Sequence, residues 1–456
     1  MFFRQYQLPC LSLYSYLIGD ETTGRAVVVD PQRDISPYLD DARANALHIE
    51  RVIETHFHAD FLSGHLELAA ATNAVISYGE AAVADFAIDR LSDGQRISLG
   101  NVLLEIRHTP GHTPESISIV VWQHADDETP WAVLTGDTLF IGDVGRPDLF
   151  AASGLTADAM ARTLYRSLHE SILVLPDPTR VFPAHGAGSS CGKQLSTAAS
   201  STIGEQRATN YALAPMSIDR FVDVVAEGQS VAPRYFPFAA TANRRRHELL
   251  DDHVPPDALD VDAALAAMRR GAIAIDTRAP EMFASGHLRD AVNVGLDGRF
   301  AEYAGDVIRF GQPIVLIADL EHDTEAKVRL ARIGFDNIVG NLATIADVLV
   351  DRPDLAVTSR RLTAREYATL AIATPHLQVI DVRNPSEQRD GTLPNARTIP
   401  LAQLLDRIDE LDPRAPTVVY CAGGYRSSIA TSLLRSKRFV DVADILGGFS
   451  AALAHV

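Results

Sequence analysis

Cysteine is scarce in this sequence of 456 residues, and long hydrophobic runs are missing from it. The three cysteines stand far apart, at Cys10, Cys191 and Cys421. A framework of disulfide bonds is therefore excluded, and reduced, individually placed thiols are expected. No apolar run approaches the roughly eighteen residues that a membrane span requires, and the N-terminus lacks the pattern of a cleaved signal peptide. We expect a cytoplasmic protein without a membrane partner.

Positive charge is also in deficit. Lys and Arg number 41 against 59 Asp and Glu, which gives a formal net charge of −18. Nucleic-acid binding is not expected, because contacts with phosphates need clustered Lys and Arg. The remaining composition, 46% hydrophobic and 22% charged, is close to that of globular proteins. At roughly 100–200 residues per domain, the length predicts two to four domains.

The first half of the chain alternates short strand-like runs with helical patterns. Runs rich in Val, Ile and Leu occur at 26–30, 102–108, 116–122 and 131–137, and their length is typical of strands. Several of these runs end in Asp or His just where a loop begins, which is a common way to build a metal site. The turn-rich stretch 241–256 lacks apolar periodicity and ends in two prolines, so we predict a linker there.

An internal repeat of about 100 residues follows the predicted linker. The segment IDTRAPEMFASGHLRDAVNV, with Asp276 and Arg278, aligns with IDVRNPSEQRDGTLPNARTI, with Asp381 and Arg383. Strand-like runs alternate with helical patterns in both copies. Each copy is therefore predicted to form a small α/β domain around a parallel sheet.

Histidine and aspartate gather in four short motifs, in the order THFHADF, TPGHT, TGDT and PAHG. Neutral imidazole and carboxylate are the ligand types that hold Zn or Fe at neutral pH. Each motif lies at a predicted strand end beside Gly, Thr or Pro, so we predict that they converge on a metal site. The side chains concerned are His56, His58, Asp60, His112, Asp137 and His185.

The content and order of these motifs resemble those of the metallo-β-lactamase superfamily over the segment 1–240. This resemblance implies an αββα sandwich with the metal at one edge of its two sheets. In two-metal members, the motif HxHxDH gives two histidines to one metal, and its aspartate and last histidine to the other. Here Phe61 stands in place of the last histidine. Phenylalanine cannot bind a metal, so the second site loses a ligand, and this weakens the likeness to glyoxalase II-like hydrolases, which use both metals.

Within the superfamily, the segments ETHFHADFLSGH, TPGHTPESIS and GDVGRPDL resemble the persulfide dioxygenases. The resemblance implies one Fe(II) per chain, held by His56, His112 and Asp137, with Zn as a substitute. Two imidazoles and one carboxylate leave three positions open on Fe(II), enough for a persulfide sulfur and dioxygen together. The remaining residues of the motifs would orient ligands and bound water, or form a second site. They are His58, Asp60 and His185.

Two further residues flank this predicted site. Arg146 in GDVGRPDL is predicted to bind a carboxylate of a thiol cosubstrate such as glutathione. The alternative is an ion pair with Asp143 or Asp148 that orders the loop. Cys191 follows His185 in HGAGSSCGK and could reach the metal cleft as an auxiliary thiol. The alternative is a small buried hydrophobic residue.

Cys421 follows the strand-like run TVVY and opens a helical pattern, in CAGGYRSS. Glycines let successive backbone N–H groups surround one sulfur atom, and the positive end of the helix adds to their effect. With Arg426 nearby, these effects favour a thiolate, so Cys421 is predicted to be a nucleophile that carries a persulfide. The residues predicted to cradle that persulfide are Ala422, Gly423, Gly424, Tyr425 and Ser427.

The segment 358–456 resembles a rhodanese domain, with the signature DVR and a final LGGF. A protein phosphatase or arsenate reductase is the alternative, but phosphatase loops normally run one residue longer between cysteine and arginine. The first repeat, 257–352, carries the rhodanese-like GHLRDAVNV and has Asp319 where Cys421 stands in the second. Without a nucleophile, the first repeat is predicted to be an inactive, structural copy.

The predicted organisation is a persulfide dioxygenase domain at 1–240, the linker at 241–256, an inactive rhodanese-like domain at 257–352 and an active one at 358–456. This order of modules resembles bacterial fusion proteins that detoxify sulfide. We expect O2 to oxidise a low-molecular-weight persulfide, of glutathione or another thiol, to thiol and sulfite. The coupled rhodanese step would form or use thiosulfate. We also expect a homo-oligomer.

Two alternatives stay open from the sequence. One is a metal-dependent thioester hydrolase, like glyoxalase II, with an attached sulfurtransferase. The other is a sulfur carrier or scaffold in which the metal is purely structural. The metal separates the three interpretations: one Fe favours the dioxygenase, two metals the hydrolase, and a closed four-ligand Zn the carrier.

Overall fold

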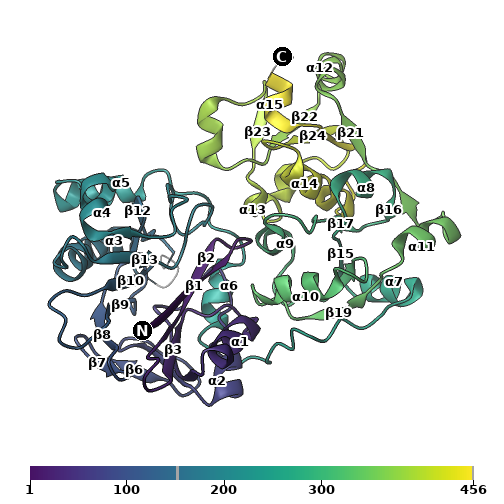
Figure 1. Cartoon of the computed structure of the whole chain (residues 1–456). Helices are drawn as coiled ribbons and strands as arrows, with labels where there is room; N and C mark the ends of the chain where they lie inside the picture. The colour runs from purple at the N-terminus through teal and green to yellow at the C-terminus, as the bar shows by residue number, and fades with distance from the viewer. Residues whose placement is uncertain (150–153, 454–456) are drawn as a thin grey trace. The chain divides into compact units, whose positions relative to one another are not determined.

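The structure is a computed structural model that describes residues 1–149 and 154–453. The chain divides into two compact units (Figure 1). Unit 1 comprises Met1–Ala232 and Phe236–Leu250, and unit 2 comprises Pro233–Tyr235 and Asp251–Val456. Among the described residues, no helix is both long enough and apolar enough to cross a lipid bilayer.

The first sheet of unit 1 has six strands in sequence order, drawn in purple and blue in Figure 1. Its first three strands are antiparallel hairpin partners, and the strands from β3 to β6 run parallel. The strands are β1 (Phe2–Leu8), β2 (Leu13–Gly19), β3 (Arg25–Val29), β4 (His48–Ile53), β5 (Val75–Gly79) and β6 (Asp89–Leu91). The helices α1 (Ser36–Ala44) and α2 (His65–Thr72) follow β3 and β4.

The second sheet of unit 1 also has six strands, in the order β14-β13-β10-β9-β8-β7. Its strands are β7 (Arg96–Ser98), β8 (Leu103–His108), β9 (Ile117–Trp122), β10 (Ala132–Gly136), β13 (Arg180–Pro183) and β14 (Ser201–Thr202). After β10, the chain forms a separate two-stranded ribbon of β11 (Leu139–Phe140) and β12 (Asp143–Val144). The accompanying helices are α3 (Ala157–Ser167), α4 (Ile203–Thr209) and α5 (Ile218–Ala226), with a π-helical turn at Leu168–Ile172.

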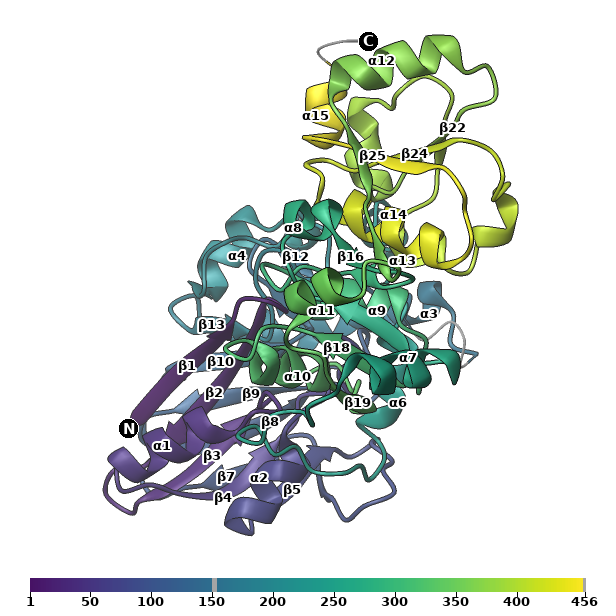
Figure 2. The same cartoon turned by 90° about the vertical axis from the view of Figure 1, so that its right-hand side faces the viewer.

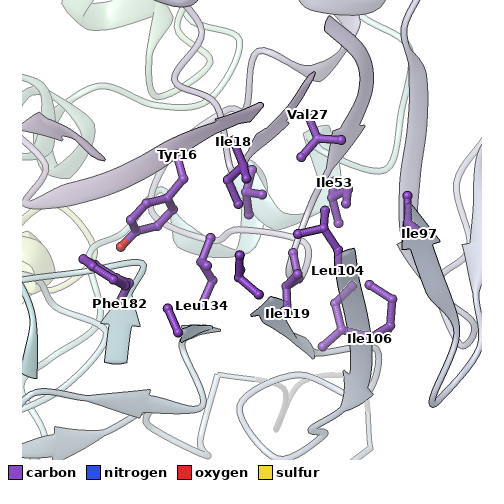
Figure 3. Packing of buried hydrophobic residues seen from close by; sticks show 14 of the residues in the cluster. Tyr16, Ile18, Val27, Ile53, Ile97, Leu104, Ile106, Ile119, Leu134 and Phe182 are labelled. Atoms are coloured by element: carbon purple, nitrogen blue, oxygen red, sulfur yellow. The ribbon is translucent and has the colours of Figure 1, made fainter. Parts of the chain in front are cut away.

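The core of unit 1 lies between the two sheets, where alternate strand residues face each other (Figure 3). Tyr16 and Ile18 of β2 point into this layer, whereas Leu17 packs on the opposite face with residues of α1 and α2. This alternation follows from the two-residue period of a strand. Leu164 of α3 and Phe221 of α5 cover the outer face of the second sheet. The predicted αββα sandwich is confirmed.

The first repeat of unit 2 forms a four-stranded parallel sheet in the order β17-β15-β18-β19. Its strands are β15 (Ile273–Asp276), β17 (Val292–Asn293), β18 (Ile314–Ile317) and β19 (Ile338–Asn341). The helices are α7 (Val261–Arg269), α8 (Pro280–Ser285), α9 (Phe300–Val307), α10 (Asp323–Ala331) and α11 (Ile345–Asp351). A ribbon of β16 (His287–Leu288) and β20 (Ala356–Val357) completes it.

The second repeat forms a five-stranded parallel sheet in the order β21-β25-β24-β22-β23, seen in Figure 2 with its green and yellow elements. Its strands are β21 (Arg360–Leu362), β22 (Gln378–Asp381), β23 (Ala396–Thr398), β24 (Thr417–Tyr420) and β25 (Val442–Ile445). Its helices are α12 (Ala364–Ala373), α13 (Leu401–Leu404), α14 (Tyr425–Ser436) and α15 (Gly448–Leu453). The two small parallel-sheet domains predicted from the repeat are thus confirmed.

The first part of the predicted linker, 241–256, belongs to unit 1. Its first residues finish α6 (Phe236–Ala242), and Asn243 is fully buried. The Asn243 amide donates hydrogen bonds to the backbone oxygens of His58 (2.8 Å) and Phe61 (2.7 Å). This stretch therefore supports the loop that carries the first histidine motif. The predicted domain boundaries themselves remain a prediction.

Candidate functional site

The four histidine and aspartate motifs lie where strands of both sheets of unit 1 end. His56 and His58 follow β4 of the first sheet, and His112 lies in the loop after β8 of the second sheet. Asp137 comes directly after β10, and His185 follows β13 by two residues. β9 runs antiparallel to both β8 and β10, and β10 runs parallel to β13. The strands β8, β10 and β13 therefore run in the same direction, and the loops that follow them lie at the same edge of the sandwich.

Three of these side chains converge. The ligand atoms of His56, His112 and Asp137 all lie within 4.8 Å of one another, and all three residues are buried. Oδ2 of Asp137 is 3.4 Å from Nε2 of His112 and 3.8 Å from Nε2 of His56. Among the described residues, Asp137 Oδ2 and His56 Nε2 have no hydrogen-bond partner. Buried polar atoms without a partner are costly, so these residues fit a metal ion that all three would bind.

Hydrogen bonds on the far side of each ring orient the two histidines. Nδ1 of His112 lies 2.9 Å from the backbone oxygen of Arg146, so Nδ1 is the donor of this bond and Nε2 is the ring nitrogen directed at Asp137. Nδ1 of His56 lies 3.0 Å from Oγ1 of Thr55, whose hydroxyl donates to Asp30 Oδ2 at 2.8 Å. Burial, together with the neighbouring histidines, holds the pKa of His56 well below its usual value. The neutral ring is the form that binds metals.

His185 joins two carboxylates. Its Nδ1 lies 2.7 Å from Asp137 Oδ1, and its Nε2 lies 2.6 Å from Asp60 Oδ2. Burial alone would lower the pKa of His185, but the two carboxylates raise it to about 10. Asp137 therefore directs one oxygen to His185 and the other to the convergent side chains.

His58 faces away from that convergence. Its Nε2 lies 3.0 Å from Asp30 Oδ1 and 3.3 Å from Glu54 Oε2. The Phe61 ring packs against His58, with the ring centroids 4.3 Å apart, and Phe61 is only 1% exposed. Asp30, Glu54 and His58 form a separate buried group of ligand-type atoms. The two histidines of the HxH motif thus point to different partners.

Cys191 lies in the site as well. It is buried and forms, with Asp60 and His185, a further group whose ligand-type atoms lie within 4.8 Å of one another. Burial and the nearby carboxylates raise the pKa of the Cys191 thiol well above its usual value. Cys191 is thus both a buried residue and a thiol beside the histidine and aspartate motifs, so its position does not separate the two alternatives.

Arg146 is engaged by its own loop. Its guanidinium makes two hydrogen bonds of 2.7 Å with Asp148 and a third, of 3.1 Å, with the backbone oxygen of Ser190. The side chain is 3% exposed. This is the loop-ordering role that the sequence left open beside substrate binding. The neighbouring Gly145 has no room for a side chain, since a Cβ there would lie 1.9 Å from the backbone oxygen of Asp137.

Two residues near the site, Asp30 and Glu54, belong to none of the four motifs. Asp30 accepts hydrogen bonds from the backbone N–H and the hydroxyl of Thr55, and it also contacts His58. Glu54 contacts His58 and, at 3.5 Å, His65. The only signals were that Asp30 ends a strand-like run and that Glu54 directly precedes the THFHADF motif.

The loop after β24 encloses the sulfur of Cys421, which is 2% exposed. The backbone N–H of Gly424 donates to the sulfur at 3.1 Å, and Oγ of Ser427 lies 3.6 Å from it. Gly424 has a φ of +109°, a conformation that disfavours every other residue type. The helix α14 begins directly after it, so its N-terminal end faces the sulfur. Ala422 and Gly423 lie in the same turn.

Arg426 pairs with a carboxylate of the same repeat. Its two terminal nitrogens lie 2.6 Å from the two oxygens of Glu387, and this pairing holds the pKa of Arg426 above its usual value despite burial. No hydrogen bond between Arg426 and the sulfur is found among the described residues. Glu387 therefore fixes the position of Arg426 on the first turn of α14.

The two repeats share a scaffold and differ in the loop. Asp381 pairs with Arg383 at 2.7 Å in the second repeat, and Asp276 pairs with Arg278 at 2.7 Å in the first. Asp319 lies two residues after β18, in a cavity of about 520 Å³. The first repeat thus keeps the buried ion pair and lacks the nucleophile.

Comparisons with known proteins match both units. Residues 8–185 match the metallo-beta-lactamase superfamily, and residues 260–344 and 363–455 each match the rhodanese-like domain. The human mitochondrial persulfide dioxygenase ETHE1 is 32% identical over 248 residues, which cover 53% of this chain and 87% of that protein. The cytoplasmic hydroxyacylglutathione hydrolase of Arabidopsis thaliana is 34% identical over 183 residues, 40% of this chain and 66% of that protein.

A solved structure extends the likeness beyond unit 1. A metallo-beta-lactamase from Staphylococcus aureus is 33% identical, with a TM-score of 0.68, and the match covers 75% of this chain and 98% of that one. Because 75% of the chain is longer than unit 1, the likeness includes residues of unit 2.

Proposed function

This chain belongs to the metallo-β-lactamase superfamily, in the family of the persulfide dioxygenases, and carries two rhodanese-like domains; on that premise we propose that it oxidises a persulfide and transfers sulfur. The substrate is a low-molecular-weight thiol persulfide, RSSH. The balanced reaction is RSSH + O2 + H2O → RSH + sulfite + 2 H⁺. The observation that carries the proposal is the convergence of two histidines and one aspartate, in which His56 Nε2 and Asp137 Oδ2 lack a hydrogen-bond partner among the described residues.

The metal proposed for this site is one Fe(II), held by His56, His112 and Asp137. When bound, iron with this ligand set supplies open positions for dioxygen and a sulfur ligand. Zn is the substitute expected from the same donor types. The three ligand residues are at most 1% exposed, so their facing atoms are shielded from bulk solvent.

Three neighbouring residues orient these ligands. The Arg146 carbonyl and the Thr55 hydroxyl each fix one histidine ring with Nε2 directed at the site. His185 holds one oxygen of Asp137, so the other oxygen faces the histidines. Such contacts commonly change metal affinity or activity by about 10- to 100-fold when removed.

The sulfur-transfer step is assigned to Cys421. Its thiolate takes the outer sulfur of a persulfide, Cys–S⁻ + RSSH → Cys–SS⁻ + RSH. Sulfite then removes that sulfur as thiosulfate, Cys–SS⁻ + SO₃²⁻ → Cys–S⁻ + S₂O₃²⁻, and the reverse reaction consumes thiosulfate. The N–H of Gly424 is placed to stabilise the anionic sulfur in each state, and Oγ of Ser427, which accepts from the thiol at 3.6 Å, lies beside it.

The proposal assigns the dioxygenase to 1–240 and sulfur transfer to 358–456, with 257–352 as an inactive copy and 241–256 between them. A cytoplasmic location, a homo-oligomer and a role in sulfide detoxification remain predictions. Sulfite made at iron would meet the tethered rhodanese-like domain at raised local concentration, which favours thiosulfate as the product.

Metal analysis combined with oxygen uptake tests the proposal. The purified protein is expected to contain one Fe per chain and to consume O2 when given glutathione persulfide. The second candidate is thioester hydrolysis, which is favoured by the Arabidopsis hydrolase and by the additional group formed by Asp60, His185 and Cys191. Two tightly bound metals with hydrolysis of a hydroxyacylglutathione, and no oxygen uptake, would replace the first candidate with the second.

A further inference from the structure

The helix that follows the Cys421 loop is held by the repeat that has no cysteine. Three residues of α14, Tyr425, Ser428 and Ser432, contact β17 of the first repeat or the segment just after it. They are spaced i, i+3 and i+7, so they lie on one face of the helix. We propose that the cysteine-free repeat positions the persulfide loop through this face, with Tyr425 as the positioning residue nearest to the sulfur. The proposal rests on the sulfur-transfer part of the proposed function.

Tyr425 binds the first repeat with its hydroxyl group. The hydroxyl donates to the backbone oxygen of Gly295 and lies 3.2 Å from that of Asp297. The ring packs edge-on against Tyr303 of α9, with the centroids 5.5 Å apart. Tyr425 also lines the cavity around Asp319, the position that corresponds to Cys421. Tyr425, which belongs to the loop that holds Cys421, thus lies at the edge of the corresponding cavity in the first repeat.

Asn293 of β17 provides the second attachment. Its backbone N–H donates to the Ser432 hydroxyl and its side-chain oxygen accepts from the Ser428 hydroxyl, both at 2.9 Å. Its amide nitrogen donates to the backbone oxygens of Asp276 and Arg278. Asn293 is fully buried. Because its polar groups are satisfied by both repeats at once, α14 cannot shift along β17 without breaking buried hydrogen bonds.

The attachment matters for Cys421 because the groups that contact its sulfur belong to the start of the same helix. Gly424, which donates to the sulfur, directly precedes Tyr425, and Ser427 lies on the first turn of α14. On the other side of the loop, Arg426 is fixed by Glu387 of its own repeat. Consecutive residues therefore fasten the loop to two different repeats. Loss of the Tyr425 attachment would let the N-terminal turn of α14 move away from the sulfur.

The test is Tyr425→Phe in the full chain, which removes the hydroxyl and keeps the ring. The alkylation rate of Cys421 by iodoacetamide is followed as a function of pH by peptide mass spectrometry, which separates it from the other two cysteines. We expect its midpoint to move up by on the order of half a pH unit. We expect kcat for sulfur transfer from thiosulfate to cyanide to fall about fivefold, the size of one lost hydrogen bond, with KM for thiosulfate little changed.

Tyr367→Phe is the matched control. Tyr367 lies in α12 of the same repeat, is 2% exposed, and is not part of the face that contacts the first repeat. The same atom is removed, and neither the pH profile nor kcat should change. If Tyr425→Phe leaves the midpoint and kcat at the values of this control, the positioning role is refuted.

Two further outcomes are distinguishable. If the wild-type chain transfers no sulfur but Tyr425→Phe still shifts the alkylation midpoint, the proposed function fails and the positioning role stands. If Tyr425→Phe does not fold, Ser428→Ala replaces it, because this change removes one attachment to Asn293 and leaves the loop itself intact. A smaller shift in the same direction is then expected, and an unshifted profile in a folded Ser428→Ala protein refutes the role.

Discussion

Asp306, at the end of α9 in unit 2, is expected to make the stability of this unit fall as the pH rises. The carboxyl group is 4% exposed and accepts a hydrogen bond of 3.2 Å from the backbone N–H of Arg234. Burial, reinforced by the charge of Glu302, raises its pKa from 3.8 to about 8, although Arg299 and Arg234 oppose the shift. The folded protein therefore holds this carboxyl protonated at neutral pH.

The size of the effect follows from the two pKa values. Below pH 3.8 both states are protonated and the group adds no pH dependence. Between 3.8 and about 8 the unfolded chain loses the proton and the folded chain keeps it, so the free energy of unfolding falls by about 1.4 kcal/mol per pH unit. From pH 5 to pH 7 the loss is about 2.7 kcal/mol. Above pH 8 the slope vanishes, because both states are ionised.

The perturbation is Asp306→Asn, which keeps the shape and removes the titration. Asp406→Asn is the control, because this carboxylate belongs to the same cluster through its ion pair with Arg234 but is 59% exposed. Both tryptophans, Trp122 and Trp131, lie in unit 1. Tryptophan fluorescence therefore reports on unit 1, and unit 2 needs its own probe.

The assay is hydrogen–deuterium exchange of peptides covering 300–307 in a urea series, at several pH values from 5 to 9. The wild type and Asp406→Asn should show the same declining free energy of opening between pH 5 and pH 8. Asp306→Asn should lack that slope and should exceed the wild type at pH 9. Equal slopes in the wild type and Asp306→Asn would refute the assignment of a protonated Asp306 in the folded state.

Three further predictions concern the two sites. His112→Ala removes one of the convergent ligand atoms, so iron content and oxygen uptake should both be lost in a protein with an unchanged CD spectrum; retained stoichiometric iron would contradict the ligand set. Cys421→Ser should leave iron-dependent oxygen uptake intact and abolish thiosulfate turnover, because a hydroxyl is far less acidic than a thiol. Loss of oxygen uptake would mean that the sites are not separate, and residual sulfur transfer would assign activity to the first repeat. Gly145→Ala should lower iron content and melting temperature, since its Cβ would lie 1.9 Å from the Asp137 backbone oxygen; a fully loaded variant would show that the loop can shift.

The residue pattern was sufficient to predict the fold class and to name candidate site residues. Strand–helix alternation and an internal repeat were sufficient to predict the two parallel-sheet domains, and the resemblance of the motifs to the metallo-β-lactamase superfamily implied the sandwich that precedes them. Short motifs at strand ends named His56, His112 and Asp137, which the fold brings within 4.8 Å of one another. The role of Gly424 and of the helix after it could also be predicted, because the conformation of a glycine and the dipole of a helix depend on residues that are close in sequence.

The partner that each polar side chain faces could not be predicted before the fold was known. His56 and His58 are two residues apart and indistinguishable in the motif, yet one points to Asp137 and the other to Asp30 and Glu54. In the same way, Arg146 forms an ion pair with Asp148 of its own loop.

The attachment of Tyr425 to the first repeat was equally hidden, because it joins residues 130 positions apart. Its acceptors are backbone oxygens, which leave no residue-type signal in a sequence. A buried polar side chain must be hydrogen-bonded, because leaving it without a partner is costly, and this requirement sets its direction. Its partners can be far away in sequence, since the fold determines which groups lie near it.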